Sequence, residues 1–401
     1  MNIFFRAVIF FAIAAPLQGF TQGIKNGDWK GIIHYEEVEV PFTFSLDTNN
    51  ASVEVVIKNG EEEIKIKTAR IKDDSLIIPM YVFDSELRAV YKGGILIGEW
   101  HKNYKKEKGP QFTAIHNQPR YGSKSSVATS IANKLGITFT QPSGQTSEAI
   151  GLFKQNGNTL TGSVITAVGD FRYFEGIVYG DSFSISSFDG VHAFLMLGVN
   201  INGNWSGVFH YENGYSETWT SSSTNIKELE KPFSVITVEP HVHKPYYDIL
   251  TAGGEYNAIN ADELDGKVII IQLMGTWCPN SLDQTQYLTN WYKKQNKNKL
   301  ALMAVTYEPG NKEYSEKRID YYSKLLNIPY PMYIGGRMSK GQAALAFPNM
   351  GKINAFPTLV LIDKQGYIRY IHSYFNGPAT GDYYLQFDTE FNERVNELLE
   401  E

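Results

Sequence analysis

The amino-acid sequence predicts a multidomain chain in which an all-β part, an antiparallel barrel or sandwich, precedes an α/β part. The chain has 401 residues, and a typical domain length of ~150 residues gives two to three domains. Residues 24–235 contain short apolar runs separated by turn residues, whereas residues 236–401 alternate apolar runs with helical patterns. This change of pattern places the boundary between the two parts near residue 235.

Composition limits the classes of protein to which the chain can belong. Apolar residues make up 42% of the sequence, and there are 35 glycines, as in globular proteins. The net charge is −6, from 37 basic and 43 acidic residues, which excludes a broad basic surface for nucleic acid. A single cysteine, Cys278, excludes an intrachain disulfide and a cysteine-based zinc site. The sequence indicates no cofactor and no metal site.

The first 23 residues have the features of a secretory signal peptide. Arg6 supplies a short positive segment, and residues 7–15 form an apolar stretch that is too short to span a bilayer. We therefore expect export to the periplasm or cell envelope; an uncleaved buried strand is the alternative interpretation. No later segment reaches 18 uninterrupted apolar residues, so no stable membrane insertion is expected.

Residues 24–235 are expected to form antiparallel strands joined by tight turns. Apolar residues alternate with polar ones on both sides of Asn59-Gly60, which is typical of a hairpin because Asn-Gly tolerates positive φ. Residues 160–219 contain five turn dipeptides at similar intervals, a pattern that favours a meander closed as a barrel or stacked as a sandwich. These turn dipeptides are Gly169-Asp170, Gly180-Asp181, Asp189-Gly190, Asn202-Gly203 and Asn213-Gly214. Residues 101–147 are the least regular.

Residues 236–401 are expected to form an α/β domain, because apolar strand candidates alternate with helical patterns. The final helix has its apolar residues three or four positions apart, which places them on one face. These residues are Tyr384, Phe387, Phe391, Val395 and Leu398. The other expected elements are strands at 268–273, 300–306, 359–362 and 367–371, and helices at 279–297 and 312–326.

Two separated motifs in the α/β part carry the chemistry. The apolar strand at 268–273 leads into Trp277-Cys278-Pro279-Asn280-Ser281, and Ala355-Phe356-Pro357-Thr358 precedes the strand at 359–362. Together they resemble the active-site turn and the cis-proline loop of thioredoxin. More narrowly, residues 240–401 are similar to the TlpA/ResA-like branch of envelope thiol-disulfide oxidoreductases with a β-rich N-terminal region.

Three other segments add to this resemblance. Gly377-Pro378-Ala379-Thr380-Gly381 is similar to a late loop of that branch. Residues 171–176 and 187–194 are similar to motifs of its N-terminal region, to which no chemistry is assigned. In the second of these segments, Asp189-Gly190 followed by His192 is typical of a hairpin turn with a strand histidine beside it.

The resemblance implies a role for each site residue, and the position of Cys278 gives a physical reason for its own. A helix N-terminus stabilises a thiolate, which is the nucleophile of disulfide exchange. Pro279 suits the first helical position, and residue 281 lies one turn further on the same face. By resemblance, Cys278 is the nucleophile, Trp277 shields the site and Pro357 shapes the groove for an extended substrate.

The sequence departs from the family at two positions. Ser281 stands where a resolving cysteine would be, so a hydroxyl can bond the thiolate but cannot release a mixed disulfide. Gln272 stands where the thioredoxin strand carries a buried acid, so that base is missing as well. Both changes indicate that the two-cysteine cycle is lost and that only chemistry with one thiol remains.

Three functional interpretations remain open. The first is a monothiol thiol-disulfide oxidoreductase of the envelope whose partners are protein or small-molecule thiols and disulfides. The second is a redox-inactive binding or scaffold protein of the envelope, since a lone cysteine is often only a small buried apolar residue. In the third, the β-rich part is functional and the α/β part serves as a dock. The sequence names no ligand for the β-rich part.

Overall fold

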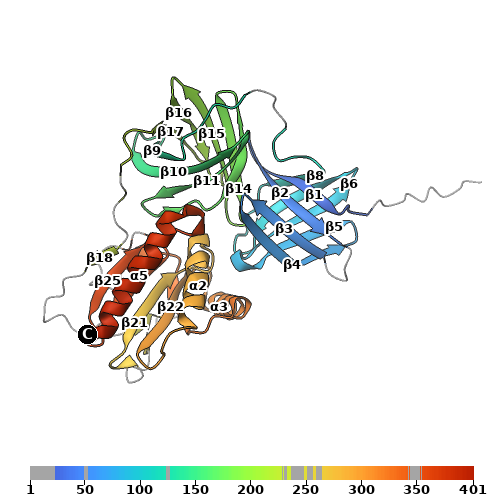
Figure 1. Cartoon of the computed structure of the whole chain (residues 1–401). Helices are drawn as coiled ribbons and strands as arrows, with labels where there is room; N and C mark the ends of the chain where they lie inside the picture. The colour runs from blue at the N-terminus through green and yellow to red at the C-terminus, as the bar shows by residue number, and fades with distance from the viewer. Residues whose placement is uncertain are drawn as a thin grey trace, which may run out of the picture.

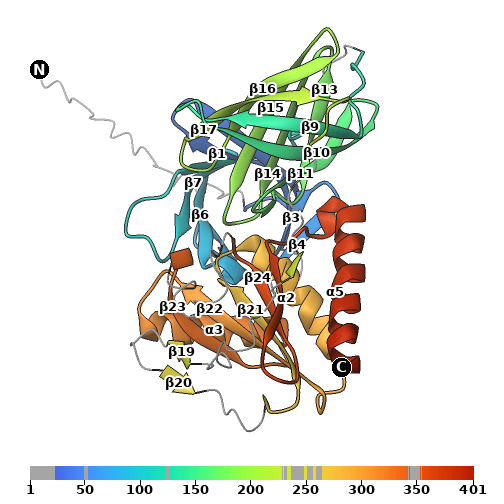
Figure 2. The ribbon, with the colours of Figure 1, turned by 90° about the vertical axis from the view of Figure 1, so that its left-hand side faces the viewer.

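The computed structural model shows two closed β-sheets followed by a mixed sheet covered by helices. In Figure 1 the second closed sheet lies at the top, the helix-covered sheet lies below it, and the first barrel lies beside both. Figure 2 shows the same arrangement after a turn of 90°. Residues 1–22 of the expected signal peptide lie outside the described residues. The structure describes residues 23–48, 53–122, 127–227, 229, 233–235, 248–250, 256–258, 264–341, 343, 353 and 355–401.

The first barrel consists of strands β1 to β8, and β8 pairs with β1 to close it. The predicted hairpin at Asn59-Gly60 is confirmed as β3–β4, but Asn59 is the last strand residue and pairs with Glu62. The turn itself is therefore Gly60 and Glu61. The elements are β1 (Gly27–Tyr35), β2 (Val38–Asp47), β3 (Val53–Asn59), β4 (Glu62–Lys72), β5 (Ser75–Met80), η1 (Tyr81–Phe83), β6 (Ser85–Lys92), β7 (Ile95–Lys102) and β8 (Gln111–His116).

The second barrel is formed by strands β9 to β17 and closes through the pairing of β10 with β11. The predicted meander is confirmed from β13 to β17, and Asn202 and Gly203 both have positive φ, as a two-residue hairpin turn requires. Its strands are β9 (Lys134–Thr140), β10 (Thr146–Asn156), β11 (Thr159–Thr166), β12 (Gly169–Asp170), β13 (Phe174–Tyr179), β14 (Ser182–Phe188), β15 (Ala193–Ile201), β16 (Asn204–His210) and β17 (Ser216–Ser222).

The β-rich part therefore contains two barrels, where the sequence predicted one barrel or sandwich. Turn spacing reports strands and hairpins but does not show where a sheet closes, so it could not count the barrels. The segment 101–147, which looked least regular, contains β8 and β9. It is the connection between the two barrels, and this explains its mixed pattern.

The two barrels share side chains where they meet. Asn59 is fully buried, and its side chain bonds the backbone of Phe188 in both directions, with distances of 2.9 and 3.2 Å. Inside the first barrel, the centroid of the Phe188 ring lies 4.4 Å from the centroid of the Phe42 ring. Ala193 and Leu195 of β15 belong to the same apolar core. The second barrel thus completes the core of the first.

The α/β part has a six-stranded sheet in the order β18-β25-β24-β21-β22-β23. Strands β21, β22 and β23 are parallel, and β24 runs antiparallel to β21. Its elements are β18 (Phe233–Val235), β19 (Asp248–Leu250), β20 (Tyr256–Ala258), β21 (Val268–Met274), α2 (Pro279–Tyr292), β22 (Leu300–Glu308), α3 (Lys312–Leu326), β23 (Met332–Arg337), β24 (Thr358–Ile362), β25 (Ile368–Ser373), η3 (Pro378–Thr380) and α5 (Asp382–Glu400).

Helices α2, α3 and α5 share one apolar core with side chains from one face of this sheet. The predicted apolar face of the last helix is confirmed, with Phe387, Phe391, Val395 and Leu398 buried. The helix expected at 279–297 ends at Tyr292, before a run of polar residues, and strand β23 was not predicted. In the described residues, no helix is both long and apolar enough to cross a lipid bilayer.

Candidate active site

Cys278 lies at the junction of the central strand β21 and helix α2, as predicted. Its backbone is extended, with φ −99° and ψ 119°, and its carbonyl accepts the first helical hydrogen bond from Leu282 N at 3.1 Å. Pro279 occupies the first helical turn, where the absence of an N–H group costs nothing. The sulfur is therefore held at the N-terminal end of the helix axis.

The loop before β24 forms the opposite wall of the site. The Phe356–Pro357 peptide bond is cis. The Cys278 thiol donates a hydrogen bond to the Phe356 carbonyl oxygen at 3.5 Å. Two sequence segments almost 80 residues apart therefore meet at the sulfur, as the two motifs indicated.

Aromatic side chains support this wall. The Trp277 indole donates a hydrogen bond to the Tyr307 carbonyl oxygen at 2.8 Å. The Trp277 ring stands edge-on to Phe356, and Tyr307 stacks on the other side of that ring at 5.3 Å. Trp277 is half-buried, so it covers one side of the cysteine without closing the site alone.

Ser281 on α2 and Gln272 on β21 are both fully buried. Ser281 is fully buried, and its hydroxyl has no hydrogen-bond partner of normal geometry among the described residues. The Gln272 amide donates to the Gln284 side chain at 3.1 Å and accepts from the Thr285 hydroxyl at 3.2 Å. Gln272 is thus held in a neutral polar network and supplies no base.

The environment of Cys278 raises the pKa of its thiol above the ordinary value, mainly because the residue is buried. The Ser281 hydroxyl, the backbone N–H groups of Asn280 and Ser281, and the positive charge of Arg172 act in the opposite direction. The sequence predicted that the helix N-terminus would favour the thiolate. That effect is present, but the loss of water around the sulfur outweighs it.

The second barrel covers the start of α2, a contact that the sequence did not predict. Arg172 is buried and donates to the Pro279 carbonyl oxygen at 3.1 Å. Its guanidinium also forms ion pairs with Asp283 of α2, at 3.2 Å, and with Glu62 of the first barrel. Arg172, Glu62 and Asp283, here called the Arg172 cluster, therefore join all three parts of the molecule.

Asp170 adds a second set of bonds between the same parts. Its carboxylate accepts hydrogen bonds from Gly377 N and Arg172 N at 2.7 and 2.6 Å. The Asn280 side chain donates to the Asp170 and Phe375 carbonyl oxygens at 3.1 and 3.2 Å. The late Gly-Pro-Ala-Thr-Gly loop thus serves, through Gly377, to attach the second barrel.

Asp189 and His192 form the turn that the sequence predicted, but the turn faces the cysteine. One Asp189 oxygen accepts from Val191 N and His192 N at 2.8 and 2.7 Å, and the other lies 3.4 Å from His192 Nδ1. Burial tends to raise the pKa of Asp189, but the charge of His192 and its hydrogen bond to the carboxylate lower that pKa to about 2. The nearby carboxylates of Glu212 and Asp189 raise the pKa of His192 although burial opposes this.

These residues enclose a cavity of about 280 Å³ beside the sulfur, here called the Cys278 cavity. Trp277, Cys278, Pro279, Asn280 and Phe356 line one side, and Asp170, Arg172, Asp189 and His192 of the second barrel line the other. Cys278 is only 9% exposed. The roles of Cys278, Ser281, Trp277 and Pro357 remain predictions, since the geometry gives their positions and not their reactivity.

The barrel residues of this site were present in two quoted segments, 171–176 and 187–194, without an assigned role. Arg172 and Asp189 belong to these segments, and both are buried charges in the structure. A charged residue inside an aromatic run is the signal that could have identified them, because buried charges require partners.

Comparisons with known proteins give partial matches. No family model matches the chain, and no curated protein is similar to it. A thiol-disulfide isomerase from Corynebacterium glutamicum is 15% identical, with 36% of this chain and 89% of that chain covered and a TM-score of 0.28. A thiol-disulfide oxidoreductase from Bacteroides fragilis is 18% identical, with 38% and 98% covered and a TM-score of 0.27.

A secreted disulfide oxidoreductase from Mycobacterium tuberculosis is 13% identical, with 39% of this chain and 98% of that chain covered and a TM-score of 0.27. These structures are described as thiol-disulfide isomerases or oxidoreductases, and each matches well under half of this chain. With such identities and TM-scores, the function of this chain has to be argued from its own residues.

Proposed function

We propose that this chain is an exported, thioredoxin-like thiol-disulfide exchange protein that works with the single thiol of Cys278. The observation that carries the proposal is the position of the sulfur. It lies at the start of α2, 3.5 Å from the Phe356 carbonyl oxygen, and it lines a cavity. Residues 1–23 are the proposed signal peptide, 24–235 the β-rich part and 236–401 the thioredoxin-like domain.

The exchange needs no second cysteine in the chain. The Cys278 thiolate attacks one sulfur of a disulfide R–S–S–R′, which forms the bond Cys278–S–S–R and releases R′S⁻ with its electron pair. An outside thiolate R″S⁻ then attacks R–S, which forms R–S–S–R″ and returns the Cys278 thiolate. The Ser281 hydroxyl favours the thiolate in both steps.

The cavity supports low-mass disulfides and thiols as the substrates. A volume of about 280 Å³ suits a small molecule and excludes a folded protein. The second barrel occupies the side from which an extended protein substrate would approach the sulfur. A protein disulfide would therefore reach Cys278 only after the Arg172 cluster opened.

A redox-inactive binding or scaffold protein is the second candidate, and a specific observation favours it. Burial raises the pKa of Cys278, which decreases the thiolate fraction at neutral pH. In this case the thioredoxin-like part would serve as a body on which the two barrels assemble.

Mass spectrometry and non-reducing gels of wild type and Cys278→Ala separate these candidates. The full chain is incubated with bis(2-hydroxyethyl) disulfide and, in parallel, recovered from an oxidising envelope. Exchange predicts a thiol-reversible mass adduct in wild type that the control lacks. Adducts to other proteins, seen only in wild type, would instead identify protein substrates. No adduct of either kind, together with resistance of the folded chain to alkylation, would support the scaffold.

A further inference from the structure

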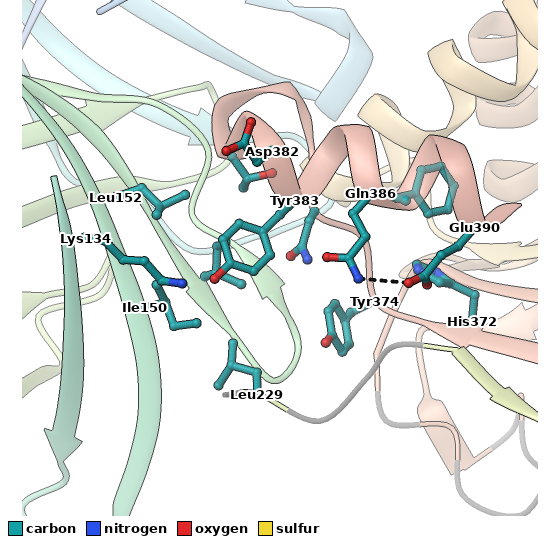
Figure 3. Close-up of a pocket in the computed structure, with 14 residues that line it drawn as sticks. Lys134, Ile150, Leu152, Leu229, His372, Tyr374, Asp382, Tyr383, Gln386 and Glu390 are labelled. Atoms are coloured by element: carbon teal, nitrogen blue, oxygen red, sulfur yellow. Dashed lines mark hydrogen bonds between the residues drawn. The ribbon is translucent and has the colours of Figure 1, made fainter. Parts of the chain in front are cut away.

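A second and larger cavity lies between the second barrel and the C-terminal helix α5 (Figure 3). Its volume is about 650 Å³, within the usual range for small-ligand sites. Side chains of β10 and β11, including Ile150 and Leu152, form an apolar wall, and Figure 3 shows Tyr383 and Gln386 of α5 facing it. Cys278 does not line this cavity, so it is separate from the proposed exchange site.

Buried polar atoms in this cavity have no partner among the described residues. His372 is 1% exposed, and neither of its ring nitrogens makes a hydrogen bond of normal geometry. Asn376 is 8% exposed, and its side-chain oxygen likewise has no hydrogen-bond partner among the described residues. Leaving such a group unbonded is costly, so these atoms point to a ligand that completes them.

The imidazole defines which groups that ligand must carry. Burial against Phe233 and Phe387 lowers the pKa of His372 to about 3, although the backbone groups of His372 and Tyr374 act in the opposite direction. The ring is therefore neutral at ordinary pH. A neutral imidazole offers one donor and one acceptor. The Asn376 oxygen adds a second acceptor. An amide group, which has a donor and an acceptor side by side, matches this set.

The outer part of the cavity carries more negative than positive charge. Asp382 and Glu390 supply two carboxylates, and Lys134 supplies one ammonium group, which lies 5.3 Å from the centre of the Tyr383 ring. The Glu390 carboxylate accepts a hydrogen bond from Gln386 at 2.8 Å, so it is held in place. This balance favours a ligand with a free amine over one with a net negative charge.

We propose that the α5 cavity binds a short peptide through its amide groups and its free α-amino group. The amides bond His372 and Asn376, an apolar side chain packs on Ile150 and Leu152, and the amine lies near the two carboxylates. The volume restricts the ligand to a few residues. The site lies between the second barrel and the α/β part, and it is independent of thiol chemistry.

Isothermal titration calorimetry of the full chain with trileucine tests the proposal. We expect one saturable site, with binding about tenfold weaker for N-acetyl-trileucine amide, which lacks the amine. Hexylamine, which has the amine but no amide, should bind about a hundredfold more weakly. His372→Phe should weaken trileucine binding about tenfold by removing both ring nitrogens.

Two further variants keep the test independent of folding. Gln386→Trp, at an exposed position of α5, should fill the cavity and abolish binding. Leu385→Trp, at the preceding residue and outside the cavity, should leave the affinity unchanged. Absence of saturable binding of trileucine at millimolar concentration would overturn the proposal. So would equal affinity for hexylamine, or unchanged affinity in Gln386→Trp.

Discussion

The guanidinium of Arg172 lies 3.2 Å from the Asp283 carboxylate, although the first residue belongs to the second barrel and the other to helix α2. The same side chain reaches the carbonyl oxygen of Pro279, the residue after the cysteine. Together with the bonds of Asp170 to Gly377 and Asn280, this arginine attaches the second barrel beside the sulfur.

Arg172→Met should expose Cys278 and destabilise the fold. Removal of one partner from a buried ion pair leaves Glu62 and Asp283 uncompensated, which typically costs about 3–5 kcal/mol. Arg172 also lowers the pKa of Cys278, so faster alkylation in the variant would come from access and not from acidity. Iodoacetamide labelling and urea unfolding measure the two effects. Arg88→Met, which breaks the ion pair of the exposed Arg88 side chain with the buried Glu86 of the first barrel, serves as the control. Equal labelling rates in both variants would contradict the covering role.

Asp283→Asn should change how stability depends on pH. Burial and the neighbouring carboxylates raise the pKa of Asp283 to about 7, although Arg172 acts in the opposite direction. In the unfolded chain the carboxyl loses its proton at about pH 3.9. Between about pH 4 and pH 7 the folded state therefore binds one proton that the unfolded state does not. The stability of wild type relative to the variant should fall as pH rises through this window, by at most about 1.4 kcal/mol per pH unit. Urea unfolding at several pH values measures this difference, and a difference independent of pH would show that the carboxyl is ionised throughout.

Ser281→Ala should raise the pKa of Cys278 further. The Ser281 hydroxyl is one of the groups that favour the thiolate, and the variant removes it without opening the structure. The pH profile of alkylation of the folded chain should shift to higher pH, while labelling of the urea-unfolded chain stays the same. An unchanged profile would mean that the hydroxyl does not reach the sulfur.

Ser281→Cys should restore a two-cysteine site with little loss of stability. The serine hydroxyl is buried, and among the described residues the group that it favours is the Cys278 thiolate, so its replacement by a thiol leaves no other buried group without a partner there. Under oxidation the two thiols should form a disulfide that removes both from alkylation. Gln272 supplies no base, so we expect reduction of a substrate disulfide to stay slower than disulfide formation. Persistent free thiols after oxidation would place the two sulfurs out of reach.

The sequence predicted the parts of the site that lie on one local pattern. Cys278 followed by Pro279 specifies a helix start, and the apolar run before it specifies a central strand. The contact of Arg172 with α2 depends on how two barrels pack, and no local pattern encodes that. The predicted effect of the helix N-terminus on Cys278 is present, but the burial that outweighs it could not be predicted, because the covering barrel is not visible in the sequence.

The side chains that complete the first barrel are translated long after its own strands. Strand β8 ends at His116, whereas Phe188, Ala193 and Leu195, which fill that barrel, follow about 70 to 80 residues later. A nascent chain therefore lacks these three members of the core until residue 195 has been synthesised. After proteolysis between residues 116 and 134, the two fragments should stay bound together, because side chains from both belong to one apolar core.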